Sequence, residues 1–134
     1  MKTAEHIAFA KFVANQVYIN EMNRRGIQRT VWTELGAQYA SSWISEHIGT
    51  LPDYLEPGRN IYHRKIFHSK DAYRLIEQWK TEIKSKPSAN YQADIFLLMA
   101  CTAYQSHIVL DSVTPMTVPD YQWIWRLLES FEKK

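Results

Sequence analysis

The chain has 134 residues, of which 46% are hydrophobic and 22% charged, a composition typical of one globular domain rather than of a disordered or collagenous chain. Its net charge of +2 is too small for the whole-molecule field that drives indiscriminate nucleic-acid binding, so any attraction to phosphates must be local. Five tryptophans, eight tyrosines and five phenylalanines stand against only four glycines and five prolines, and this shortage of turn formers favours helices.

The single cysteine and the charge pattern indicate where the protein works. Cys101 cannot form an internal disulfide, whereas a secreted domain more often carries an even set of cysteines. Glu5, His6 and Lys11 interrupt the N-terminal apolar stretch, which therefore lacks the core of a signal peptide. The longest uncharged stretch, residues 95–110, has 16 residues, fewer than the roughly 20 needed to span a bilayer. We expect a cytoplasmic protein without a membrane segment.

The first predicted helix covers residues 3–23. Gly26 follows it and suits the left-handed cap that ends a helix. Phe12 and Ile19 widen its apolar surface beyond one face, so this helix is expected to touch several neighbours. The main apolar face recurs at helical spacing, at Ile7, Ala10, Ala14, Val17 and Tyr18.

The second and third predicted helices flank a loop. The second runs from near Thr30 to His47 or Ile48, with Gly49 beyond its end. Residues 50–60 form the loop, and residues 61–68 fit either a short strand or, as we favour, an irregular segment. The third helix begins after Ser69. The second helix carries one narrow apolar stripe, and the third one apolar face: Trp32, Leu35, Tyr39 and Trp43, and then Ala72, Ile76, Trp79 and Ile83.

The fourth predicted helix, residues 91–110, is apolar nearly all round and should therefore be central. Ser88 or Asn90 is its expected cap. A last helix covers residues 120–133. These segments predict an all-α fold: one domain, residues 1–134, built as a compact bundle of about five helices around residues 91–110, with one short strand pair as the remaining option.

Signatures of enzyme chemistry are absent from the sequence, which holds no glycine-rich phosphate loop, GxSxG, HExxH, CxxC or EF-hand run. His63 and His68 do not converge on a helix or on a strand, so no metal site is predicted. His107 and Asp111 share a helical face and fit either an oriented general base or, as we favour, a polar cluster tying the helix to a loop. We expect no catalysis, no cofactor and no metal.

Basic residues are concentrated in two windows without an acidic residue, 24–29 and 59–70, and sequence neighbours are not expected to neutralise them. If the fold brings the windows together, they form a patch for phosphate or for an acidic protein. The alternative is two solvated segments at opposite ends of the molecule. The residues concerned are Arg24, Arg25, Arg29, Arg59, Arg64, Lys65 and Lys70.

Two tryptophans complete the candidate partner-binding residues. Trp123 and Trp125 point about 200° from each other on a helix, so either both lie in a groove or one anchors a partner or a second copy of the chain. The sequence thus predicts a non-catalytic protein-binding module, such as an inhibitor, adaptor or immunity-type protein, acting through a basic and aromatic surface. The alternative is a nucleic-acid-binding protein using the basic windows, or, third, a small ribonuclease whose acid and base are His63 and His68.

Overall fold

The computed structural model describes residues 3–51 and 70–113 of the chain, and within these ranges it contains four helices and no strand. The helices are α1 (Thr3–Arg24), α2 (Val31–His47), α4 (Lys70–Ser85) and α5 (Tyr91–Val113). The predicted all-α class is confirmed. The expected fifth helix at residues 120–133 and the strand option at residues 61–68 lie outside the described ranges.

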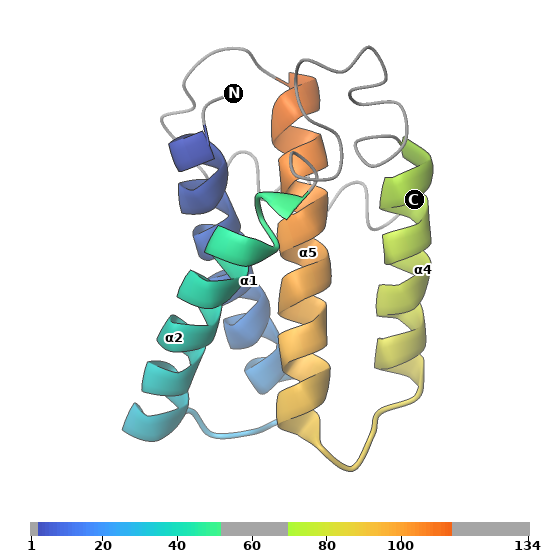
Figure 1. Ribbon diagram of the computed structural model, residues 1–134. Helices are drawn as coiled ribbons and strands as arrows, with labels where there is room; N and C mark the ends of the chain where they lie inside the picture. The colour runs from blue at the N-terminus through green and yellow to red at the C-terminus, as the bar shows by residue number, and fades with distance from the viewer. Residues whose placement is uncertain (1–2, 52–69, 114–134) are drawn as a thin grey trace.

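Helix α5 is the centre of the bundle, as the sequence predicts. It contacts α1, α2 and α4, while α1 and α2 also pack against each other. Figure 1 shows α2 and α4 on opposite sides of α5, so that α5 separates them. Because α4 and α2 pack on opposite sides of α5, one long side of α5 faces outward between its two neighbours.

Local signals at the helix ends act as the sequence indicates. Gly26 ends α1 with a φ of +67°, a conformation that glycine adopts without strain. Thr30 caps α2, because its hydroxyl accepts the Thr33 N–H at 3.2 Å while the Thr33 hydroxyl accepts the Thr30 N–H at 2.7 Å. The Asn90 side chain accepts the Ala93 N–H at 3.2 Å and caps α5.

Small residues let α1 and α2 approach each other closely. A Cβ on Gly49 would lie 2.7 Å from the Cβ of Ala10 and 2.7 Å from the carbonyl oxygen of Ser45. Helices α1, α2 and α5 share one apolar core, and α4 adds a smaller apolar cluster around Ile76 against α5. The shared core consists of Ala10, Ala14, Val17, Tyr18, Met22, Ala37, Ile44, Ile95, Leu98, Met99 and Ala103.

The buried face of α4 differs from the predicted one at two adjacent positions. Trp79 is 50% exposed, whereas Lys80 is 2% exposed. The Lys80 ammonium donates to Gln105 Oε1 at 3.0 Å, and Gln105 Nε2 donates to Glu77 Oε2 at 2.9 Å. A charged group can be buried when it is paired and hydrogen-bonded in this way. The hydrogen bond between Lys80 and Gln105 places Lys80 against α5, so Trp79 faces outward. The prediction that Trp79 lies on the buried face of α4 is wrong.

Candidate protein-docking surface

The apolar stripe of α2 faces solvent. Trp32 is 81% exposed, Tyr39 78% and Trp43 43%, and Leu35 on the same side is also exposed. Helix α2 turns a different side to the bundle, formed by Ala37, Ser41, Ile44 and Ser45. The sequence shows the stripe correctly, but the structure places it outside the core.

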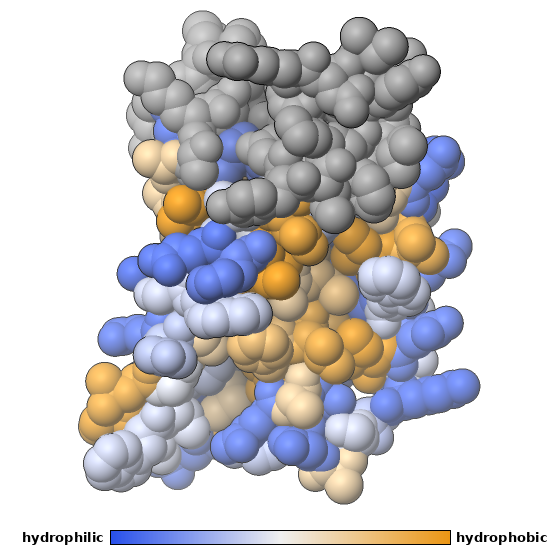
Figure 2. Space-filling view, in the orientation of Figure 1, coloured by the Kyte–Doolittle hydropathy of each residue, from blue (hydrophilic) through white to orange (hydrophobic). Residues whose placement is uncertain are grey.

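A second group of exposed apolar side chains continues from α2 across α5 to α4. Phe96 joins the two groups, because its ring centroid lies 6.1 Å from that of Trp43. Helix α5 is therefore not fully surrounded, since Phe96 and Leu97 are exposed. Figure 2 shows apolar atoms gathered in the middle of this side of the molecule, over α5. We call the whole surface the aromatic face; it consists of Trp32, Leu35, Tyr39, Trp43, Leu75, Trp79, Phe96 and Leu97.

An open groove of about 380 Å³ adjoins the α2 part of the aromatic face. Gly36 lies on its edge, and a Cβ added there would meet no atom within 4 Å. Tyr18 lines the groove and donates its hydroxyl proton to Thr33 Oγ1 at 2.9 Å. Burial, with the nearby Glu34 charge, raises the pKa of Tyr18 against the opposing hydrogen bond to Thr33, so the phenol stays neutral. The remaining wall is mostly apolar, with Met22, Trp32, Ala37, Ala40, Tyr91, Gln92, Ile95, Phe96 and Met99.

The arginines of the first basic window are all paired with carboxylates. Arg24 binds Glu21 through two hydrogen bonds of 2.7 and 2.8 Å. Arg25 lies 3.5 Å from the same carboxylate, and Arg29 lies 3.6 Å from Glu34. The expectation that sequence neighbours leave these charges unneutralised is wrong, because a helix places Glu21 one turn before Arg24 and Arg25.

This charge cluster ties the end of α1 to the start of α5. Arg25 lies 3.8 Å from Asp94, whose carboxylate also accepts the backbone N–H and the hydroxyl of Ser88 at 2.8 and 2.9 Å. Those two hydrogen bonds lower the pKa of Asp94. Burial opposes ionisation of Glu21, but the hydrogen bonds and charge of Arg24, with Lys84 and Arg25, hold its pKa below the usual value. The cluster is structural, and its cations already have anionic partners.

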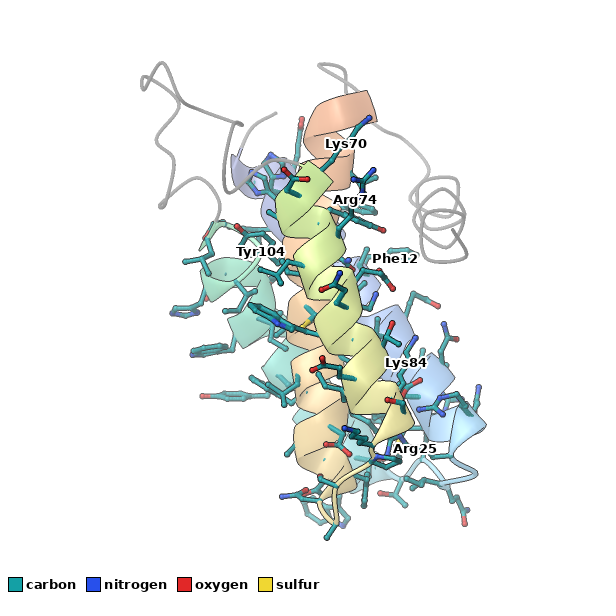
Figure 3. The ribbon with its side chains drawn as sticks, turned by 90° about the vertical axis from the view of Figure 1, so that its right-hand side faces the viewer. Phe12, Arg25, Lys70, Arg74, Lys84 and Tyr104 are labelled. Atoms are coloured by element: carbon teal, nitrogen blue, oxygen red, sulfur yellow. The ribbon has the colours of Figure 1, made fainter. Side chains whose placement is uncertain are left out.

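The structure does not bring Lys70 to the first window. Lys70 is exposed at the start of α4, and Figure 3 shows it at the opposite end of the bundle from Arg25. These two members of the windows therefore cannot share one patch. The other predicted site residues lie outside the described ranges, as do both histidines of the pair considered for acid–base chemistry: Arg59, Arg64, Lys65, Trp123, Trp125, His63 and His68.

His107 serves as a link between helices. Its Nδ1–H donates to the Gly49 carbonyl at 2.8 Å, just beyond the end of α2. Its ring stacks on that of His6, with centroids 3.6 Å apart and both side chains buried. The hydrogen bond to Gly49 supports the polar-cluster interpretation, while the side chain of Asp111 lies outside the described part. No group of three or more metal-ligating side chains occurs among residues 3–51 and 70–113.

Further findings bear on the site. In the described ranges, no helix combines the length and the apolar character that a bilayer crossing requires. Sequence reasoning missed Leu75, Phe96 and Leu97 as surface residues, because each lies in a pattern that equally predicts burial. Burial of Cys101 raises the pKa of its thiol, which disfavours the reactive thiolate.

Comparisons with protein-family models, with curated proteins and with solved structures give no match to this chain.

Proposed function

We propose that this chain is a non-catalytic protein-binding module that docks a partner protein on the aromatic face. The observation that carries the proposal is the exposure of three tryptophans and a tyrosine, Trp32, Trp43, Trp79 and Tyr39, on the two helices that flank α5. Contiguous apolar patches of this kind are rare on monomeric proteins unless they bind something. Tryptophan and tyrosine are also the residues that most often dominate the energy of protein interfaces.

Charge favours a protein over a nucleic acid at this face. Helices α2 and α5 contain no lysine or arginine, and Glu46 of α2 is exposed. A helix surface of exposed apolar side chains without lysine or arginine offers no cation to a phosphate backbone, whereas it suits the apolar side chains of a protein. We therefore assign the partner as a protein that presents an apolar surface. The proposed location is the cytoplasm, where the lone thiol of Cys101 stays reduced.

The experiment compares variants of the α4–α5 part of the aromatic face, which consists of Leu75, Trp79, Phe96 and Leu97. Trp79→Ala with Leu97→Ala removes two half-exposed side chains, so the free energy of unfolding should change by about 1 kcal/mol or less. Arg74→Ala is the matched control, because Arg74 is exposed on the same helix and lies about 140° around it from Trp79. Proteins crosslinked to each form in cells are identified, and the one shared by wild type and control is purified for titration calorimetry.

The proposal expects the double variant to bind that purified protein at least tenfold more weakly than wild type and control do. An interface anchor typically contributes about 2 kcal/mol or more, which corresponds to roughly 30-fold in the dissociation constant. Equal affinity of all three forms would overturn the proposal. So would recovery of nucleic acid alone, with no shared protein.

A further inference from the structure

We infer that the α2 part of the aromatic face binds a second copy of the chain, so that two α2 helices pack antiparallel in a homodimer. The inference rests on the proposed function, since it names the partner of one part of the same face. It leaves the α4–α5 part free for a different protein. Four observations support it: spacing, shape, charge and area.

The first observation is the spacing along α2. Trp32, Gly36, Tyr39 and Trp43 follow one another at intervals of four, three and four residues. This is the spacing by which one helix packs along another. The bundle itself uses a different side of α2, so the seam is available to a helix from outside.

The second observation is self-complementarity. Antiparallel pairing about an axis between Ala37 and Gln38 brings Trp32 of each copy opposite Trp43 of the other. The same axis brings Gly36 opposite Tyr39. Gly36 borders the groove of about 380 Å³ and has open space where a Cβ would be. A cavity of about 150 Å³ already accepts a benzene ring, so the groove has room for the ring of Tyr39 from the second copy.

The third observation is charge. The same axis brings Glu46, near the end of α2, level with Arg29 of the second copy, just before its α2 begins. The Arg29 side chain is 41% exposed, with its guanidinium 3.6 Å from Glu34, so it can approach a second carboxylate. Antiparallel packing also sets the helix dipoles in opposition, which favours this orientation over a parallel one.

The fourth observation is the exposed area. A buried tryptophan or tyrosine contributes about 150–250 Å², and Trp32, Tyr39 and Trp43 are exposed together with Val31 and Leu35. The contact would bury on the order of 600 Å² per copy, or about 1,200 Å² in total, which is the lower end of specific, stable interfaces. We therefore expect a dimer that dissociates on dilution.

The test is sedimentation equilibrium of the full chain at concentrations from micromolar to several hundred micromolar. Wild type should shift from monomer to dimer. Gly36→Leu should remain monomeric, because its side chain occupies the place of Tyr39 from the second copy, yet its melting temperature should not fall, since Gly36 has open space around it. Gly36→Ala is the matched control: it also replaces glycine in a helix but adds only a methyl group, so it should keep dimerising.

The register is tested by disulfide formation. Chains carrying Cys101→Ser are given either Gly36→Cys or Tyr39→Cys and are mixed under mild oxidation. The mixture should form the crosslinked dimer at least tenfold faster than either chain alone, because only the mixed pair places two thiols opposite each other. Equal rates in all three samples would overturn the antiparallel register.

A wild type that is monomeric throughout, or a Gly36→Leu variant that dimerises as strongly as Gly36→Ala, would overturn the inference. These results are distinguishable from failure of the proposed function. The Trp79→Ala, Leu97→Ala variant should still dimerise, because neither residue lies on α2. Gly36→Leu should still bind a partner that docks on the α4–α5 part.

Discussion

Glu21 is a buried carboxylate held between two arginines at the end of α1. Arg24 and Arg25 supply its positive neighbours, and Arg25 also reaches toward Asp94 at the start of α5. The folded chain therefore holds the pKa of Glu21 below the value it has in the unfolded chain. A group of this kind stabilises the fold above its unfolded pKa, about 4.3 for glutamate, and loses that contribution as the pH falls through the folded pKa.

We expect the unfolding free energy of wild type to fall between about pH 5 and pH 3, with Glu21 contributing part of the decrease. Glu21→Gln should be less stable at pH 7 by about 1 kcal/mol, because charge-assisted hydrogen bonds to a half-exposed Arg24 are lost. Its stability should also depend less on pH. Urea titrations at several pH values measure both effects, with the exposed Glu82→Gln as control. An unchanged pH dependence in Glu21→Gln would assign the acid sensitivity to other carboxylates.

Single residues also show which parts of the site were predictable. Glu21 precedes Arg24 by three residues, so their pairing is available from helix spacing alone, although Glu21 lies just outside the window of residues 24–29. The burial of Lys80 is different, because it depends on Gln105, which is 25 residues away in the sequence. No local pattern contains that pairing.

At the scale of the helical element, α2 and the turn after it contain two glycines with different surroundings. Gly36 has open space around it, while Gly49 is in contact with Ala10 and Ser45. Alanine should therefore have opposite effects at the two positions. Gly36→Ala gains helix propensity without a clash, whereas the added Cβ of Gly49→Ala forces α1 and α2 apart.

Thermal unfolding of the two variants tests this contrast. Gly36→Ala should raise stability by up to about 1 kcal/mol, and Gly49→Ala should lower it by about 1–3 kcal/mol through overpacking. The Gly49 variant should also weaken the hydrogen bond from His107, because its acceptor is the carbonyl of Gly49 itself. Similar melting temperatures for both variants would contradict the close packing of α1 on α2.

Elements differ in how much of them the sequence predicts. The end of α1 at Gly26, the start of α2 near Thr30 and the end of α2 before Gly49 were all expected, because each depends on residues within one turn. The direction in which the stripe of α2 faces was not expected from the sequence. Periodicity identifies the stripe from Trp32 to Trp43 but not the surface that it faces, since a core and a partner protein favour the same side chains.

At the scale of the whole molecule, α5 connects the other helices, and adjacent leucines on it have opposite surroundings. Leu98 is 1% exposed in the shared core, while Leu97 is 48% exposed on the aromatic face. Substitutions at Leu98 and Leu97 therefore test the role of α5 in folding and its role in partner binding separately.

Leu98→Asp should fail to fold, because an unpaired buried carboxylate costs several kcal/mol, on the order of the stability of a small domain. Leu97→Asp should remain helical and cooperative in circular dichroism while it weakens partner binding. A folded Leu98→Asp variant with a wild-type spectrum would contradict the central position of α5.

The stacking of His6 on His107 joins the first turns of the chain to a segment made about a hundred residues later. A ribosome adds roughly 5–20 residues per second, so α1 waits on the order of 5–20 seconds for its main packing partner. During that interval the nascent α1–α2 hairpin presents Val17, Tyr18 and Met22, which are buried in the core shared with α5 in the finished fold, without α5 to cover them. Completion of the described bundle is thus tied to the synthesis of α5, and nascent chains that stop before residue 91 are expected to be the ones that chaperones retain.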